Sequence, residues 1–346
     1  MLLKDGTIGH KIVKRATDRD YLKSLLYKSL VADRRYKLGN LGKINPKQRK
    51  ASTSVINFYS GTNNIGDIIP VLGMQEMLGY IPDSWSMLDN RIDFDFVNRN
   101  YKAVIVGGAG LFDIVFEPFW TNLLEKCELP IVIWGVGITA DVTSQSYIKT
   151  LTEVAKKCDL VNVRDHLTAE LFDIKDASIT ACPSIIYLQN YNQDINRNSD
   201  LLLYSSHEPA TAKYEKKRIK SLLDKVVANY MFTDHMQYSY LGLEDIIRDR
   251  YCNSQFVLTT RLHGAIIAYG LGIPYLAINR APKTQSFVDE YGNGIMIDDL
   301  DNLESLLIDK VQTLNSIEMK PVDLSAILDF GKQVKQWATC MSESQT

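Results

Sequence analysis

The sequence has 346 residues, of which 45% are hydrophobic and 23% are charged, and its formal net charge at pH 7 is −2. These values are ordinary for globular proteins, and the length exceeds what one core usually supports, so we expect about two domains. The near-neutral charge indicates neither nucleic-acid binding nor attraction to an anionic membrane surface. Any anion-binding site must therefore be local.

Targeting and metal-binding signals are missing from the sequence. No stretch is apolar over the roughly 18 residues that a membrane-spanning helix needs, and the first 20 residues contain no signal-peptide pattern. The cysteines are scattered and form no CxxC pair, which is typical of reduced thiols in a cytosolic protein. Neither the acidic residues nor the histidines have metal-ligand spacing. We therefore expect a cytoplasmic protein with no metal site.

Residues 1–50 form a polar, basic lead-in. Apolar residues between Tyr21 and Leu30 recur there at helical spacing, which predicts one helix followed by an irregular arm.

From residue 55 onward, short apolar runs alternate with amphipathic stretches, a pattern that predicts a parallel sheet with helices on both faces. The runs predicted to be strands are 55–60, 103–112, 130–138, 160–165 and 177–184. The stretches predicted to be helices include 70–78, 146–158 and 166–173. We assign residues 51–190 to a first Rossmann-like domain.

The polar segment 187–200 is predicted to be a linker, after which the alternation resumes. Predicted strands follow at 200–206, 228–234, 255–260, 274–278 and 293–298, and predicted helices at 210–227, 243–251 and 262–271. We assign 200–323 to a second Rossmann-like domain, and we expect 324–346, with a helix over 324–340, to pack back on the first. The predicted fold class is α/β, with two βαβ domains facing a cleft.

Ligands of such sheets bind beyond the carboxyl ends of the strands, and two predicted loops there are rich in glycine. In SGTNNIGDIIP (60–70), Asp67 is either a ligand-binding carboxylate or simply the cap of the next helix. In GGAGLF (107–112), Gly107 and Gly108 would let backbone N–H groups approach a phosphate or a sugar. Neither loop contains a complete dinucleotide-binding fingerprint.

Two further strand ends carry basic residues. Arg164 precedes Asp165, which is placed to cap a helix, so the arginine either binds an anion or pairs with Asp165 on the surface. Arg261 and His263 stand at the start of an apolar helix, whose N-terminus itself favours anions. The alternative for His263 is a structural histidine that donates to a backbone carbonyl, and the alternative for Lys283 is an ordinary surface lysine.

These motifs, in this order, resemble the polysaccharide pyruvyl transferase family over roughly residues 55–290. The resemblance is carried by NNIGD (63–67), VIVGGAG (104–110), WGVGI (134–138), VRD with Thr168 (163–168), TTRLHGAIIAYGLGIP (259–274) and Lys283. It implies a fold similar to that of GT-B glycosyltransferases. It also implies transfer of the enolpyruvyl unit of phosphoenolpyruvate to two sugar hydroxyls, which forms a pyruvate ketal and releases phosphate.

The resemblance further implies that Arg164, Arg261 and His263 lie at the donor site, with His263 as general acid and Asp67 on the acceptor side. One departure concerns the segment after the predicted fifth strand. Family members often have Asp-Pro there, whereas this chain has ACPS (181–184), with Cys182 in place of the acid.

The chemistry of phosphoenolpyruvate fits these residues, because its carboxylate and phosphate require fixed cations. We predict donor-binding and acceptor-binding residues, with Asp67 and His263 also catalytic and no cofactor beyond the co-substrate. The predicted donor-binding residues are Arg164, Arg261, Lys283, Gly107 and Gly108, and the predicted acceptor-binding residues are Asn64 and Asp67. The expected acceptor is an oligosaccharide or a lipid-linked sugar.

Two alternatives remain open at this point. One is a GT-B glycosyltransferase with a nucleotide-sugar donor, although no carboxylate is evident where such enzymes bind the ribose. The other is a non-catalytic protein that binds a sugar or an anion on the same fold.

Overall fold

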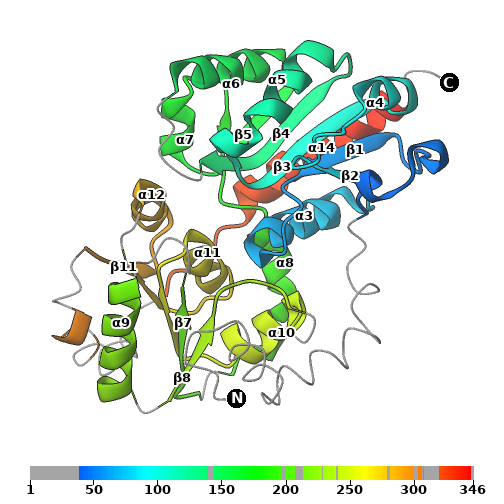
Figure 1. Ribbon diagram of the computed structural model, residues 1–346. Helices are drawn as coiled ribbons and strands as arrows, with labels where there is room; N and C mark the ends of the chain where they lie inside the picture. The colour runs from blue at the N-terminus through cyan, green and yellow to red at the C-terminus, as the bar shows by residue number, and fades with distance from the viewer. Residues whose placement is uncertain are drawn as a thin grey trace, which may run out of the picture.

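The computed structural model describes residues 39–138, 144–196, 199–206, 213–227, 229–238, 241–278, 281–298, 303–305, 307 and 319–343. The helix predicted between Tyr21 and Leu30 lies outside these residues. Within them, the chain forms two domains, each built on a parallel sheet (Figure 1). No helix among the described residues has both the length and the apolar character needed to cross a membrane.

Six parallel strands form the first sheet, in the order β2-β1-β3-β4-β5-β6. Its strands are β1 (Val55–Tyr59), β2 (Asp83–Ser86), β3 (Ala103–Phe112), β4 (Ile131–Ile138), β5 (Leu160–Val163) and β6 (Ser178–Ile179). Every residue of β1 and β4 is buried. Apart from Asn57 of β1, these two strands are almost entirely apolar, because helices cover both faces of the sheet.

The helices of the first domain follow its strands in the βα alternation that the sequence predicts. They are η1 (Leu41–Lys43), η2 (Pro46–Gln48), α3 (Ile65–Leu78), α4 (Phe94–Asn100), η3 (Ile114–Phe116), α5 (Glu117–Lys126), α6 (Gln145–Lys157) and α7 (His166–Leu171). An aromatic cluster that includes Phe58, Phe119 and Trp120 fills one face of the sheet.

Five parallel strands form the second sheet, in the order β11-β10-β9-β7-β8. They are β7 (Leu202–Ser205), β8 (Tyr230–Thr233), β9 (Phe256–Thr259), β10 (Tyr275–Ile278) and β11 (Gly294–Ile297). The helices are α9 (Lys213–Val226), α10 (Leu243–Asp245), the π-helical turn η5 (Ile246–Tyr251), α11 (Leu262–Gly270) and α12 (Pro282–Tyr291).

Two structural findings differ from the sequence predictions in the segment that joins the sheets. The fifth predicted strand, 177–184, is a strand only over Ser178–Ile179. Pro183, which has no N–H for a sheet ladder, precedes helix α8 (Ser184–Leu188). The predicted linker is also helical over η4 (Gln189–Asp194).

The two domains share a continuous apolar core. Helix α8 lies between them and contacts both α3 and α11 (Figure 1). Ile69 of α3, Ile185 of α8 and Ile266 of α11 belong to the same buried cluster. Helix α14 (Ser325–Glu343) packs on the first domain, where the ring of Phe330 meets that of Trp134 at 6.0 Å between centroids. This shared core holds the two domains together.

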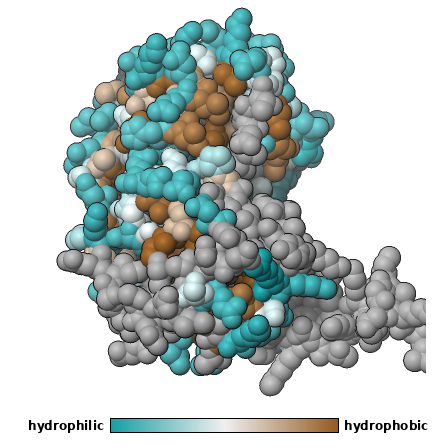
Figure 2. Space-filling model, turned by 90° about the vertical axis from the view of Figure 1, so that its left-hand side faces the viewer, coloured by the Kyte–Doolittle hydropathy of each residue, from teal (hydrophilic) through white to brown (hydrophobic). Residues whose placement is uncertain are grey.

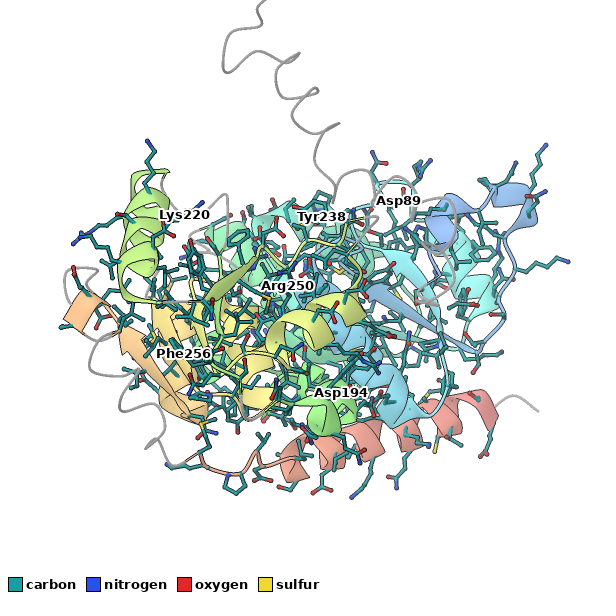
Figure 3. All side chains as sticks on the ribbon, turned by 90° about the horizontal axis from the view of Figure 1, so that it is seen from below. Asp89, Asp194, Lys220, Tyr238, Arg250 and Phe256 are labelled. Atoms are coloured by element: carbon teal, nitrogen blue, oxygen red, sulfur yellow. The ribbon has the colours of Figure 1, made fainter. Side chains whose placement is uncertain are left out.

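Backbone hydrogen bonds also join the domains along one edge. The loop before α3 pairs in antiparallel fashion with the loop after β8, through a bridge between Asn64 and Met236. The Ile65 N–H donates to the His235 carbonyl at 2.9 Å, and the Gln237 N–H donates to the Asn63 carbonyl at 2.9 Å. Tyr238, at the end of this second loop, lies near the boundary of the two domains when the molecule is seen from below (Figure 3).

Strand order places a ligand crevice in each sheet. In the first sheet the order reverses at β1, which lies between β2 and β3, and in the second it reverses at β7, which lies between β8 and β9. Ligands of open α/β sheets bind at such switch points, beyond the carboxyl ends of the strands. The loops after β1 and β9 are therefore expected to face the ligand.

Candidate active site between the two sheets

The loop after β1 presents Asp67 in the first turn of α3. The cap of this helix is Asn64, whose Oδ1 accepts a hydrogen bond from the Gly66 N–H at 3.1 Å. The expectation that Asp67 might simply cap the helix is therefore wrong. The Asp67 carboxylate instead accepts a hydrogen bond from the Thr62 hydroxyl. Asp67 thus remains available as a carboxylate at the switch point.

Arg164 is buried at the end of β5, with only 2% of its surface exposed. Its Nη2 donates to the Ile138 carbonyl at 2.7 Å, and its Nε lies 3.3 Å from Oδ2 of Asp165. Asp165 also caps α7, as the sequence predicts, by accepting the Thr168 N–H at 2.8 Å. The pair of Arg164 and Asp165 exists, but it is buried and not on the surface. The guanidinium packs directly against Gly137.

Arg261 and His263 begin α11, immediately after β9. The Thr259 hydroxyl accepts the Arg261 N–H at 2.9 Å, and Nη1 of Arg261 donates to the Ser206 carbonyl at 3.3 Å. The imidazole of His263 lies against the backbone of Gly66, at the start of α3. The two switch points of the molecule therefore meet at this contact.

The Nε2 atom of His263 is buried and has no hydrogen-bond partner among the described residues. Through this nitrogen, His263 therefore does not donate to a carbonyl of the described residues, as the structural alternative would require. An unpartnered buried nitrogen costs free energy, which a ligand that bonds to it would recover.

Lys283 lies in the first turn of α12 and is largely buried, so the alternative of an ordinary surface lysine is also wrong. Burial, together with the positive charges of Arg164 and Arg261, lowers the pKa of Lys283 to about 8, against the opposing charges of Asp113 and Asp165.

Electrostatic interactions show that these side chains converge. Burial lowers the pKa of His263 well below its ordinary value, and the charges of Arg164, Arg261 and Lys283 act in the same direction. Burial raises the pKa of the Asp67 carboxyl, and the charges of the two arginines oppose that rise. Burial also lowers the pKa of Arg261. The charges of three cations therefore act on one buried imidazole, an arrangement suited to a multiply charged anion.

Gly107 and Gly108 are explained by packing. Both lie within β3, and a Cβ at Gly107 would be 2.7 Å from Cε of Met74, while a Cβ at Gly108 would be 3.0 Å from Cβ of Pro70. Gly108 also has a φ of 85°. The glycines let α3 lie close on the sheet. The packing of α3 on the sheet therefore accounts for both glycines without a ligand.

Sequence reasoning missed the roles of Gly66 and Gly137. A Cβ at Gly66 would be 2.5 Å from Nδ1 of His263, and a Cβ at Gly137 would be 2.2 Å from Nε of Arg164. Glycine is required at both positions because the side chain of His263 or of Arg164 fills the space that a Cβ would take. The repeated glycines of WGVGI (134–138) indicate a close contact, but the sequence does not show that Arg164 is the residue in contact with Gly137.

Cys182 lies fully buried beside Ser184, with Sγ 3.2 Å from the serine Oγ, and burial raises the pKa of the thiol. Its neighbour Pro183 packs against Gly73 and Gly135. The segment that departs from the family pattern therefore has a packing role here. The described residues contain no group of three or more histidine, cysteine, aspartate or glutamate side chains that could hold a metal ion.

The sequence matches the family model for polysaccharide pyruvyl transferase over residues 10–282. The chain belongs to this family. No curated protein matches the sequence significantly. The matched region contains the loops that carry Asp67, Arg164, Arg261 and His263.

Several solved structures are similar to this chain in fold. UDP-GlcNAc 2-epimerase from Methanocaldococcus jannaschii is 12% identical, with a TM-score of 0.50 over 82% of this chain and 99% of the epimerase. UDP-GlcNAc 2-epimerase from Neisseria meningitidis is also 12% identical, with a TM-score of 0.47 over 82% and 99%. The wall teichoic acid polymerase TagF is 11% identical, with a TM-score of 0.43 over 96% and 100%. The fold is of the Rossmann-like GT-B type, as the sequence predicts.

Replacing Gly137 with alanine should displace the Arg164 guanidinium. Relief of the clash would break the hydrogen bond to the Ile138 carbonyl and the contact with Asp165, leaving buried polar groups unpaired. We expect Gly137→Ala to lower the free energy of unfolding by about 1–3 kcal/mol in urea titrations. Gly39→Ala is the control, because a Cβ there has no atom within 4 Å, and it should stay within about 0.5 kcal/mol. Equal losses in the two variants would contradict the assigned contact.

Proposed function

We propose that this protein is a ketal-forming pyruvyl transferase. It moves the enolpyruvyl group of phosphoenolpyruvate onto two hydroxyls of a sugar in a surface polysaccharide or its precursor. Membership of the family supports transferase chemistry. The observation that carries the proposal is a buried imidazole, that of His263, which lies against Gly66 at the start of α3 and experiences the charges of Arg164, Arg261 and Lys283.

The donor matches this cluster in charge and shape. Phosphoenolpyruvate carries a carboxylate and a phosphate on one carbon, and guanidinium groups bind both through paired hydrogen bonds. Arg164 is already fixed by its contacts with Ile138 and Asp165, and Arg261 by its contact with Ser206. Little side-chain entropy is lost on binding, because both arginines are held in place before the donor arrives.

The proposed reaction begins with proton transfer from His263 to the methylene carbon of the donor. The adjacent carbon then has oxocarbenium character, and the first sugar hydroxyl attacks it while its proton passes to Asp67. The carbon–oxygen bond to phosphate breaks, and the second hydroxyl attacks the same carbon, giving its proton to the departing phosphate. The products are the pyruvate ketal and inorganic phosphate, and the scheme needs no cofactor beyond the co-substrate.

Donor binding prepares His263 for this role. Without the donor, burial and, to a smaller extent, the charges of the three cations disfavour the imidazolium, so the ring is neutral near pH 7. The charges of bound phosphoenolpyruvate offset those cations and raise the pKa of His263, which then takes up the proton that it delivers. The raised pKa of Asp67 makes its carboxylate a better base for the sugar hydroxyl. We propose that Asn64, beside it in the same loop, faces the acceptor.

The direct test is incubation with phosphoenolpyruvate and candidate oligosaccharides. The proposal requires release of phosphate together with a mass gain of pyruvate less water on the sugar. Glycosyl transfer from a nucleotide sugar with no reaction of phosphoenolpyruvate would instead identify a glycosyltransferase.

His263→Gln should lower kcat by about 10²–10⁴, because it removes the proton donor. Stabilisation by phosphoenolpyruvate in thermal unfolding should persist, because the three cations remain. A variant that folds and keeps wild-type kcat would exclude His263 as the acid and favour a binding protein.

Arg261→Lys should raise the KM for phosphoenolpyruvate by about tenfold, because lysine keeps the charge but loses the forked pair of donors. Arg248→Lys is the matched control. Its guanidinium is exposed and pairs with Asp194 away from the cluster, so we expect no change in KM. Equal KM values for the two variants would argue against Arg261 as a donor ligand.

Donor affinity should also depend on Lys283 above pH 8. The pKa of Lys283 is lowered to about 8 in the empty site, and a bound anion must raise it. Between these two pKa values, rising pH removes the ammonium charge from the free protein, so the Kd for phosphoenolpyruvate should increase by up to about tenfold per pH unit. Calorimetric titrations between pH 7 and 9.5 measure this. Lys283→Arg should abolish the increase, and an identical slope in that variant would contradict the assignment.

A further inference from the structure

His235 is a buried titratable residue that the proposed mechanism does not use. It lies in the loop after β8 with none of its surface exposed, and its backbone has a φ of 62°. Few residues other than glycine adopt this left-handed conformation, because it costs free energy and persists only where the surroundings fix it. Since such residues cluster at active sites, the contacts that fix His235 are informative.

The imidazole of His235 belongs to a buried hydrogen-bonded group with Ser205 and Tyr251. Its Nε2 lies 2.9 Å from Oγ of Ser205 and within hydrogen-bonding distance of the Tyr251 hydroxyl, which also donates to Ser205 at 3.3 Å. The rings of His235 and Tyr251 lie 5.7 Å apart between centroids. Tyr251 ends the π-helical turn η5, a rare element that occurs often at functional sites. The group therefore joins the loop after β8 to the end of β7 and to η5.

This group lies under the first turn of α11, the helix that begins with His263 and its neighbours. A Cβ at Gly264 would be 2.9 Å from Oγ of Ser205, so the turn packs directly on the serine. Burial raises the pKa of the Tyr251 hydroxyl, while a hydrogen bond with Ser205 and the charge of Arg261 oppose that rise, which places the hydroxyl close to the candidate site. The position of His263 therefore depends on Ser205, and through it on the imidazole that Ser205 contacts.

The main chain of His235 reaches the other proposed catalytic residue. Its carbonyl accepts the Ile65 N–H at 2.9 Å, in the first turn of α3 and two residues before Asp67. His235 thus contacts the helix of Asp67 through its carbonyl and the support of His263 through its side chain. These two contacts join the first turns of α3 and α11 across the domain boundary.

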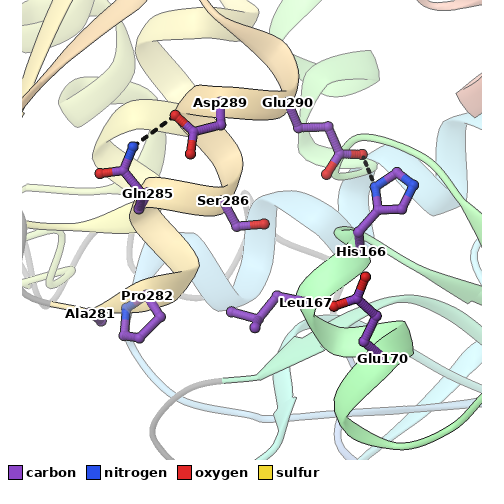
Figure 4. Close-up of a pocket in the computed structure, with 9 residues that line it drawn as sticks. All are labelled: His166, Leu167, Glu170, Ala281, Pro282, Gln285, Ser286, Asp289 and Glu290. Atoms are coloured by element: carbon purple, nitrogen blue, oxygen red, sulfur yellow. Dashed lines mark hydrogen bonds and ion pairs between the residues drawn. The ribbon is translucent and has the colours of Figure 1, made fainter.

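The domains meet differently on the opposite side of their boundary, where α7 and α12 leave an open pocket between them (Figure 4). His166 there pairs with Glu290 at 3.2 Å, and the Tyr291 hydroxyl donates to the Arg164 carbonyl at 3.2 Å. The side of the molecule that carries these helices mixes hydrophilic and hydrophobic surface (Figure 2). Exposed ion pairs contribute little free energy, so the edge that includes His235 restrains the spacing of the two sheets more strongly.

We propose that His235 is a positioning residue, which holds the first turns of α3 and α11 at the separation where Asp67 and His263 can act on one substrate. The inference rests on the proposed function, which assigns proton transfer to those two residues. With none of its surface exposed, His235 acts through them and does not touch the substrate. Its effect can still be large, because a misplacement of about 1 Å costs about 10²-fold in rate.

Two variants remove the side-chain contacts of this group with little change in shape. His235→Asn keeps a residue type that tolerates a positive φ but loses the ring, and Tyr251→Phe loses only the hydroxyl. Per folded protein, each should lower kcat by about tenfold to a hundredfold, whereas the KM for phosphoenolpyruvate should change by less than about threefold because the three cations remain. The double variant should lose no more than His235→Asn alone, since the two side chains act as one group.

Amide hydrogen exchange of Ile65 is a readout that needs no substrate. In both variants this amide should exchange at least about tenfold faster than in the wild-type protein, because the loop that carries its acceptor is loosened. Tyr275→Phe is the matched control. It removes another buried hydroxyl of the second domain, which donates to the Gly292 carbonyl at 2.9 Å near the amino ends of β10 and β11, and it should change neither kcat nor the exchange of Ile65.

Wild-type kcat in both variants, additive losses in the double variant, or unchanged exchange of Ile65 would overturn the positioning role. An equal effect of Tyr275→Phe would overturn it too, because the losses would then report only general destabilisation. Failure of the wild-type protein to release phosphate from phosphoenolpyruvate with any acceptor would instead contradict the proposed function. The exchange of Ile65 would still decide, in that case, whether His235 holds the two helices together.

Discussion

The candidate site depends on one constraint, the mutual repulsion among the cations Arg164, Arg261 and Lys283. Arg164 comes from the first domain and Arg261 and Lys283 from the second, so the charges gather only when the two sheets are pressed together. The repulsion is offset locally by backbone carbonyls and by Asp165, and globally by the apolar core shared by α3, α8 and α11. Hydrophobic burial thus holds together a site that electrostatics alone would open.

Much of the fold follows from the sequence because parallel strands buried on both faces must be apolar. The runs that became β1, β3, β4, β7 and β9 are visible for this reason. Two elements escape this rule. The edge strand β2 has the polar sequence DSWS and becomes a strand by pairing with β1. In the segment 177–184 the strand is two residues long, and Pro183 begins a helix.

The basic residues of the candidate site were also predictable, because a charged side chain at the end of a buried strand has few structural explanations. Their surroundings were not. The contacts of Gly137 with Arg164 and of Gly66 with His263 join elements that are distant in the chain, and only packing reveals them. Gly107 and Gly108 show the opposite case. Their pattern is typical of phosphate binding, but in this structure they leave room for helix α3 to pack on the sheet. Local sequence shows that a residue is unusual, whereas its partner depends on the tertiary fold.

The antiparallel pairing of the loop around Asn64 with the loop around Met236 has a mechanical consequence. Main-chain hydrogen bonds on this edge tie the rim of one sheet to the rim of the other, while α7 and α12 meet through side chains. A rotation that separates α7 from α12 and preserves the main-chain bonds must use this edge as its axis. Asp67, in the first turn of α3, and His263, which lies against Gly66, are close to that axis and would move least.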